Sequence, residues 1–331
     1  MRVLLSDGSG LTARQAATQL ASHGHTVQAL SPDPLCLTRF TRWVQRVNRV
    51  PPYGADPMRW LDAALAAYRS AGMDVLLPTQ EQVAVLSAAA GRVRAAGVRT
   101  AVPSFSALAR VQDKISAFAT LTAAGLPQPP ATVLETAGQA AGWDRFPVFL
   151  KLPIGTATTG VSLVTGPAGR DRFVAAAGAA GAFTMGGLLA QRPVAGPLVM
   201  AQSVFDRGEL VAWHACLRAR EGAAGGASHK RSTSLPAIRE HLAVLGRELG
   251  WHGALSADAI LSDAGPCYID INPRLVEPGN AWQVGVDLVA PMLDLAAGTA
   301  PPPQPGGRPD IRTHQLLIAV LGADQRTGRR R

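Results

Sequence analysis

The first thirty residues show a strand, a glycine turn, a helix and a second strand, and this order constrains the fold most strongly. The apolar run Val3–Ser6 ends in Asp7-Gly-Ser-Gly, a helical pattern covers about 12–22, and Thr26–Leu30 is the next strand. Such a unit predicts a parallel sheet. Two further strands and two helices complete a doubly wound α/β domain over residues 1–110: Asp74–Leu77, Val98–Val102, about 57–71 and about 81–94.

After residue 110 the pattern changes to hairpin-joined strands with flanking helices, which predicts an α+β part with antiparallel sheets. Hydrophobic residues make up 47% and charged residues 17% of the 331, so a folded core is expected throughout. The second part is divided into a first lobe at 111–187, a second lobe at 188–300, and a segment at 301–331 with a Pro-rich linker, a short helix and a basic tail.

The net charge of +9 reflects a preference for arginine, because only Lys114, Lys151 and Lys230 are lysine. Aromatic residues make up 5%, which gives little support to base stacking, so we expect no nucleic-acid partner. No apolar run approaches the ~18 residues that span a bilayer. The three cysteines are scattered without a CxxC pair, which fits a reduced cytoplasmic protein.

Two aspartates on a predicted hairpin are the sharpest chemical signal. The turn Ser-Asp-Ala-Gly-Pro is centred on Ala264, and Asp258 and Asp270 each lie six residues from that centre. A symmetric register therefore places them opposite each other, with Asn272 on the same face. Oxygen ligands of this kind suit Mg²⁺. The alternative is a pair of solvated aspartates on a surface hairpin.

Lysine scarcity supplies a second signal. Lys151 lies in the apolar strand Val148-Phe-Leu-Lys-Leu and is followed by Pro153-Ile-Gly-Thr-Ala-Thr-Thr-Gly-Val. A strand lysine before a loop of small and hydroxyl residues indicates a phosphate cradle, although it is not a Walker A loop. Lys114 follows Asp113 at the start of a helix. The alternatives are a snorkelling edge-strand lysine and a plain surface lysine.

The N-terminal segment Gly8-Ser-Gly-Leu-Thr-Ala13 also matches G-x-G-x-x-A after a strand, and Asp33 follows the next strand. This pattern leaves open an NAD(P)-binding Rossmann dehydrogenase.

Four blocks in order resemble the ATP-grasp superfamily, in the form of the carboxylate–amine or carboxylate–thiol ligases and of the ATP-binding domains of biotin carboxylase and of the carbamoyl phosphate synthase large chain. They lie between about Val111 and Ala297: Gln112-Asp-Lys114, Phe149-Leu-Lys151 with its loop, Leu188-Leu-Ala-Gln191-Arg-Pro-Val-Ala-Gly196, and Asp258 with Ile269-Asp-Ile-Asn-Pro-Arg274. The resemblance implies a pre-ATP-grasp domain followed by a two-lobed ATP-grasp domain.

The resemblance also implies roles for individual residues. Those for ATP are the phosphate lysines Lys114 and Lys151, the loop residues Thr156, Thr159 and Gly160, and the hinge residues Gln191, Arg192 and Val194; those for Mg²⁺, or Mn²⁺ in its place, are Asp258, Asp270 and Asn272. Arg274, with Lys151, meets the reacting carboxyl phosphate. Asp258 and Gln191 replace the family's usual glutamates.

The implied reaction is ligation: ATP activates a small carboxylate as an acyl phosphate, which an amine attacks, in a monomer or homodimer. A kinase on the same fold stays open. Candidate substrate residues are Ser9, Thr12, Glu81, Arg218, Lys230 and Glu277. For Ser9 and Thr12 the alternative is a helix cap. The segment Glu221–Ser234 is expected to lie over the acceptor site or to be an ordinary surface loop.

Overall fold

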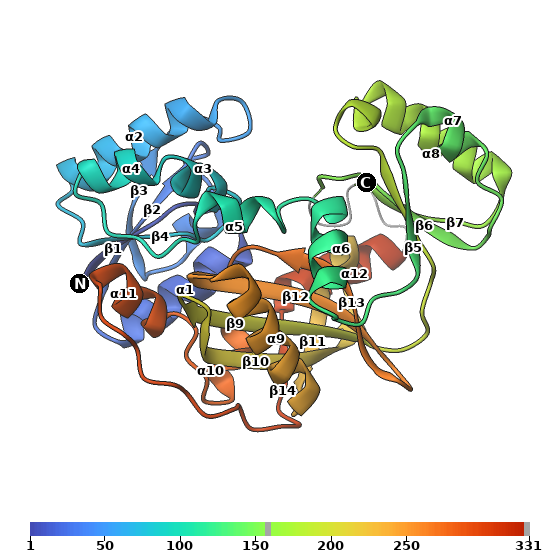
Figure 1. Cartoon of the computed structure of the whole chain (residues 1–331). Helices are drawn as coiled ribbons and strands as arrows, with labels where there is room; N and C mark the ends of the chain where they lie inside the picture. The colour runs from blue at the N-terminus through green and yellow to red at the C-terminus, as the bar shows by residue number, and fades with distance from the viewer. Residues whose placement is uncertain (156–159, 328–331) are drawn as a thin grey trace.

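Three β-sheets make up the chain in this computed structural model, which describes residues 1–155 and 160–327 (Figure 1). The N-terminal sheet is parallel, and the other two are antiparallel. This mixed α/β architecture agrees with the predicted fold class. No helix within the described ranges is long and apolar enough to cross a membrane.

The N-terminal domain consists of β1 (Arg2–Leu5), α1 (Leu11–Ser22), β2 (Thr26–Ser31), η1 (Leu37–Phe40), β3 (Val44–Arg49), α2 (Pro57–Ser70), β4 (Val75–Leu77), α3 (Val83–Ala88), α4 (Ala90–Ala95) and α5 (Phe105–Ala109). Its strand order is β3-β2-β1-β4. Val3 and Leu5 pack on the side of α1, whereas Leu4 packs with Trp60 of α2, so helices cover both faces.

The fourth strand of this sheet differs from the sequence expectation. Residues 98–102 form no strand, and only the carbonyl of Arg99 accepts a hydrogen bond, from the N–H of Leu76. The sheet is instead extended at its other edge by β3, which pairs with β2. Charged and amide side chains mask the strand character of β3 in the sequence, and its apolar Val44 and Val47 contact the core.

The small antiparallel sheet has its own core and the order β5-β8-β6-β7. Its elements are β5 (Ala131–Leu134), α7 (Ala137–Ala141), β6 (Val148–Lys151), β7 (Val161–Val164), α8 (Pro167–Ala179), η2 (Ala182–Thr184) and β8 (Leu188–Gln191). The sequence division assigned β8 to the second lobe. It pairs here with β5 and β6 because Leu188 and Ala190 are buried in this core.

The large antiparallel sheet has the order β13-β12-β9-β10-β11-β14. The elements of the large sheet and of its surroundings are β9 (Leu198–Asp206), β10 (Glu209–Glu221), η3 (Ala223–Gly225), β11 (Ala227–Ser232), α9 (Pro236–Leu249), β12 (Gly253–Ser262), β13 (Gly265–Asn272), α10 (Gly279–Gln283), α11 (Ala290–Ala297), β14 (Arg312–His314) and α12 (Leu316–Thr327), and α6 (Lys114–Ala123), which precedes the small sheet in the sequence, packs against them. Apolar residues of α6 and α9 cover one face. The opposite face carries polar side chains such as Gln202, His214 and Asp258 and, at one end, the apolar Val204, Ala212 and Ala254.

Two segments expected to be loop or linker are ordered parts of this sheet. Residues 221–234 do not form a loop over an acceptor site, because β10 and β11 pair as far as Glu221 and Ala227. The tip between them packs closely on α12, where a Cβ on Gly222 would collide with Ile318. In the segment 301–331, β14 adds a strand beside β11, and Gln304 donates its N–H to the carbonyl of Val211.

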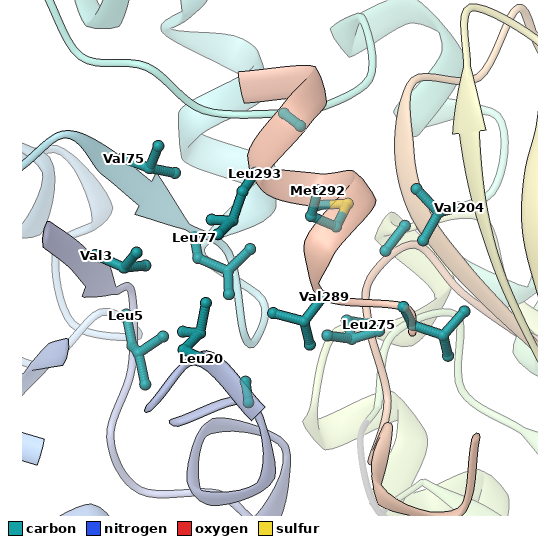
Figure 2. Packing of buried hydrophobic residues seen from close by; sticks show 14 of the residues in the cluster. Val3, Leu5, Leu20, Val75, Leu77, Val204, Leu275, Val289, Met292 and Leu293 are labelled. Carbon is teal, nitrogen blue, oxygen red and sulfur yellow. The ribbon is translucent and has the colours of Figure 1, made fainter. Parts of the chain in front are cut away.

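The N-terminal sheet and the large sheet share one hydrophobic core. Figure 2 shows Leu293 and Met292 of α11 between Leu77 of β4 and Val204 of β9. Leu275, just beyond β13, belongs to the same cluster. This packing fixes the carboxyl edge of the N-terminal sheet against the end of β13, where residues from both parts meet.

Candidate active site

The hairpin of β12 and β13 places Asp258 directly opposite Asp270, as the sequence predicted. The tight turn, however, pairs Ser262 with Gly265 and is centred half a residue before Ala264. A β-bulge at Ile269 takes up the difference between the two registers. Bulges often re-aim groups beside functional sites. Here the carbonyl of the bulged Ile269 accepts a hydrogen bond from Lys151 Nζ at 2.8 Å.

The two facing carboxylates form a site that fits a hard cation. Burial, and after it the neighbouring carboxylate of Asp270, raise the pKa of Asp258 to about 7 against the lowering effect of Lys230 and Arg274. Asn272 lies on the same face. No group of three or more His, Cys, Asp or Glu in the described residues is arranged to hold a metal by itself. This oxygen-only, incomplete donor set suits Mg²⁺, which takes further ligands from water and phosphates.

Two lysines flank the carboxylates. Lys114 Nζ lies 3.0 Å from Asp270 Oδ1, and Lys151 is only 5% exposed. Burial lowers the pKa of Lys151 to about 8, although Asp270 opposes the shift. Asp113 caps α6 by accepting the N–H groups of Ile115 and Ser116, which fixes the start of the helix that carries Lys114. Both lysines are therefore positioned to meet anionic oxygens beside the carboxylates.

The loop after Lys151 closes on itself at its ends. Leu152 donates its N–H to the carbonyl of Gly160 at 2.7 Å, and Gly160 has a φ of +79° that favours glycine. Lys114 donates its N–H to the carbonyl of Pro153, which joins this loop to α6. The predicted phosphate contacts Thr156 and Thr159 lie outside the described residues.

The predicted hinge connects the small sheet to the large one. Gln191 is buried at the end of β8, Arg192 is exposed, and Val194 is half-buried. Gly196 has a φ of +143°, and a Cβ there would collide with the carbonyl of Leu261, so glycine is required. The connection therefore runs directly over the hairpin that carries Asp258.

Arg274 joins the large sheet to the N-terminal domain. Its Nε donates to Glu81 Oε1 at 2.8 Å, and its carbonyl accepts the hydroxyl of Ser256. Thr12 Oγ1 accepts the N–H of Glu277 at 3.0 Å. Helix α1 begins after Gly10 without a side-chain cap, so the capping interpretation of Ser9 and Thr12 is wrong. The N–H and hydroxyl of Ser9 donate to Asp7 instead.

Lys230 and Glu277 form a buried ion pair, with 2.6 Å between Nζ and Oε2. Burial alone would lower the pKa of Lys230, but the carboxylate of Glu277 and further neighbours raise it above its usual range. Arg218 lies opposite Lys230 across β10 and β11 and pairs with Glu221. Lys230 thus belongs to a strand rather than to a covering loop, and its charge lies near Asp258.

A cavity of about 270 Å³ adjoins the carboxylates and Lys114. It is lined by Tyr53, Glu81, Gln112, Asp113, Lys114, Ala117, Pro153, Ile154, Gly155, Asp270, Ile271, Asn272 and Pro273. Tyr53 was missed by the sequence analysis because it lies in an unpatterned loop between β3 and α2. Gln112 belongs to the sequence block Gln112-Asp-Lys114, but the sequence analysis assigned it no role in the site.

A polar chain of three residues on the same face was also missed. His214 Nε2 lies 2.6 Å from Asn280 Oδ1, and Asn280 donates to Thr313 Oγ1 at 2.7 Å. His214 alternates along β10 with Cys216 and Arg218, which is the pattern that would have placed it on this face. These hydrogen bonds tie the middle of β14 to α10, close in sequence to Glu277.

His214 predicts a measurable loss of stability in acid. Burial lowers its pKa to about 4, with Lys230 contributing and Asn280 opposing. An unfolded histidine has a pKa of ~6.5, so the unfolded chain takes up the proton first as the pH falls. The contribution of neutral His214 to the free energy of unfolding is fully present above a pH of ~6.5, and the free energy of unfolding should fall by about 3 kcal/mol by about pH 4. Urea unfolding of His214→Gln, which does not titrate, should lack this component; an unchanged pH profile would contradict the assignment.

The glycines of the N-terminal G-x-G-x-x-A match are explained by packing. A Cβ on Gly8 would lie 2.5 Å from Thr38 Oγ1, and one on Gly10 would lie 2.5 Å from Gln80 Nε2. Asp33 accepts the N–H of Leu35 within its turn. Packing against the protein's own side chains therefore accounts for Gly8, and a local turn accounts for Asp33.

Comparison with known proteins rests on structure alone, because no family model and no curated protein matches the chain. Biotin carboxylase from Campylobacter jejuni matches 94% of this chain and 74% of its own, with a TM-score of 0.74 and 19% identity. Carboxyaminoimidazole ribonucleotide synthase from Aspergillus clavatus, complexed with ATP, matches 93% of this chain and 79% of its own, with a TM-score of 0.70 and 14% identity. L-amino acid ligase from Bacillus licheniformis matches 89% of this chain and 73% of its own, with a TM-score of 0.67 and 14% identity.

Proposed function

The chain has the ATP-grasp fold, and from this premise we propose that it is an ATP-dependent ligase that joins a small carboxylate to an amine and releases ADP and phosphate. The observation that carries the proposal is the facing pair Asp258 and Asp270 with two lysines beside it. These groups form a site for a metal-bound triphosphate. The dehydrogenase alternative is not favoured, since its glycine pattern serves internal packing.

The nucleotide would lie between the small sheet and the polar face of the large sheet. Lys114 and Lys151 would bind the phosphate oxygens, and the backbone near Val194 would meet the base at the hinge. Asp258, Asp270 and Asn272 would hold Mg²⁺, which when bound neutralises phosphate charge during phosphoryl transfer. Residues 1–110 would form the pre-ATP-grasp domain, which supplies Glu81 to the site.

Arg274 would orient the substrate carboxylate for reaction. A carboxylate oxygen attacks the γ-phosphorus, the bond from this phosphorus to the bridging β–γ oxygen breaks, and ADP leaves. The amine nitrogen then attacks the acyl carbon, inorganic phosphate leaves with its electron pair, and the nitrogen loses a proton. Arg274 and Lys151 stabilise negative charge at the phosphoryl group. The chain supplies position and charge rather than a side-chain nucleophile.

A screen for ADP release tests this function and separates it from the kinase alternative. The protein is incubated with Mg-ATP and pooled carboxylic acids and amines, and products are identified by mass. A ligase gives a condensed product with loss of water and stoichiometric phosphate. A phosphorylated product that accumulates without condensation, even when amines are present, would instead support a kinase.

Lys151→Met should weaken ATP binding while the fold remains intact. Loss of a hydrogen bond to a charged group costs about 1.5–3 kcal/mol, or roughly 10- to 150-fold in Kd. Methionine suits this site because Lys151 is buried. Calorimetric titration with Mg-ATP measures the change, and Arg145→Met, an exposed position in the same lobe, is the control. Equal ATP affinity in the Lys151 variant would exclude the phosphate role.

A further inference from the structure

Two histidines face each other at the outer edge of the large sheet. β14 is the edge strand beyond β11, and His314 lies directly opposite His229 in their antiparallel pairing (Figure 1). Because the N–H of Gln315 donates to the carbonyl of Ser228 at 2.8 Å, the two histidines form a non-hydrogen-bonded pair. Side chains of such a pair come closer together than those of a hydrogen-bonded pair, so both rings can reach one small ligand.

The pair lies on the face of the sheet that the candidate active site does not use. Side chains alternate along a strand, so Lys230 and Thr313, which neighbour the histidines, point to the opposite face. There Lys230 pairs with Glu277, and Thr313 accepts a hydrogen bond from Asn280. The histidine pair is therefore separate from the residues assigned above to nucleotide, Mg²⁺ and substrate.

The two imidazole rings are arranged as neighbouring ligands of one ion. Their centroids are 4.3 Å apart, and their planes are tilted by 55°. A metal at ~2.0–2.1 Å from a ring nitrogen lies ~3.2 Å from the ring centre, so the separation of 4.3 Å corresponds to an angle of ~84° at the metal. This angle is close to the right angle of the square-planar sites that Cu²⁺ and Ni²⁺ favour, and well below the tetrahedral ~109° of Zn²⁺.

Hydrogen bonds behind His229 orient its ring for a metal. The hydroxyl of Ser228 donates to the carbonyl of Arg220 at 3.1 Å, and its oxygen lies 3.1 Å from His229 Nδ1. Because the hydroxyl proton is engaged, its oxygen accepts from Nδ1–H, and Nε2 keeps its lone pair. Hydrogen bonds of this kind fix the tautomer and direction of metal-binding histidines. The ring of the exposed His314 forms no hydrogen bond or ion pair with the described part of the chain, so its nitrogens are also available.

We propose that His229 and His314 bind a divalent transition-metal ion that favours square-planar geometry, Ni²⁺ or Cu²⁺, through Nε2 of His229 and one ring nitrogen of His314. Water completes the coordination, since the described residues offer no third His, Cys, Asp or Glu at this place. Imidazole is a suitable ligand for both ions. The ion ties β14, a strand of three residues, to β11 and so holds Thr313 against Asn280. The metal site does not depend on the proposed ligase function.

Isothermal titration calorimetry of the full chain with nickel chloride, at about pH 7.5 and so above the usual pKa of histidine, tests the site. His229→Gln and His314→Gln should each raise the Kd for Ni²⁺ by at least about 10-fold, the lower limit for residues that only orient a metal ligand. Bound Cu²⁺ should show two nitrogen ligands by electron paramagnetic resonance in the wild type and one in either variant. His241→Gln is the matched control and should bind as the wild type does, because this histidine packs against Tyr268 rather than against another histidine.

Arg220→Gln tests the same place through charge. Arg220 lies opposite His229 on β10, so its guanidinium repels a cation, whereas the backbone carbonyl that holds Ser228 stays in the variant. Arg220→Gln should therefore bind Ni²⁺ at least as tightly as the wild type, and weaker binding would contradict the site.

Hydrogen exchange checks the site without any substitution. Saturating Ni²⁺ should slow exchange of the Thr313 amide, because the bound ion holds β14 on β11. Unchanged exchange there, no binding of Ni²⁺ by the wild type, or an unchanged Kd in both histidine variants would overturn the proposal.

Discussion

Asp270→Asn is expected to reduce Mg²⁺-dependent ADP release by about 10³-fold or more, because a bound metal contributes several kcal/mol to the transition state. The variant should fold normally. Asp270 faces another carboxylate, and its charge is one of the causes that raise the pKa of Asp258. Removing one of two facing charges relieves their repulsion, which offsets the loss of the ion pair between Asp270 and Lys114, so the melting temperature should change little. Activity across a Mg²⁺ titration and thermal unfolding measure the two effects.

Asp263→Asn is the control for that experiment. Asp263 lies in the turn of the same hairpin and is exposed, so the substitution changes the same chemical group at a distance from the site. Its ADP release should match the wild type. Normal Mg²⁺-dependent turnover in Asp270→Asn would show that the metal is held elsewhere.

Arg274→Ala is expected to lower turnover by about 10²- to 10³-fold, the usual cost of removing one donor aimed at developing negative charge. ATP affinity should change far less, because Arg274 contacts Glu81 of the N-terminal domain, whereas Lys114 and Lys151 are the residues proposed to bind the phosphates. The contrast between kcat and the Kd of Mg-ATP separates a substrate role from a nucleotide role. Both comparisons are valid only if the variant keeps the wild-type fold, which its circular dichroism spectrum checks.

Arg239→Ala, on the exposed side of α9, removes the same side chain from the opposite face of the large sheet. It should leave kcat and ATP affinity unchanged. A parallel loss of ATP binding and turnover in Arg274→Ala would instead place this arginine among the nucleotide contacts. Unchanged turnover would remove it from the reaction.

The sequence predicted most local elements because their signals are local. Pro236–Leu249 begins with proline and ends before Gly250 in the left-handed conformation, and α9 has these bounds. The facing aspartates were predicted by symmetry, although the actual turn and the bulge at Ile269 produce that register by different means. The half-residue shift of the turn and the bulge compensate each other, and neither can be read from the sequence because only the pairing of the two strands reveals them.

Long-range partners account for what the sequence could not supply. The pairing of Arg274 with Glu81 joins residues 193 positions apart, and that of Thr313 with Asn280 depends on a strand at the far end of the chain. Strand β3 was missed because its amide and basic side chains hide the two valines that pack inward. Lys230 lay in a stretch rich in glycine and serine, which resembles a loop until β14 pairs beside it.

The position of β14 has a consequence for how the protein is made. During synthesis on the ribosome, the other five strands of the large sheet emerge before residues 312–314. Until then β11 is an open edge with unpaired N–H and carbonyl groups, which invites pairing with other chains. Two histidines, His229 and His314, meet across the final pairing. The hairpin that carries Asp258 and Asp270 therefore emerges before the strand that holds Asn280, and the open edge of β11 favours aggregation of the nascent chain in that interval.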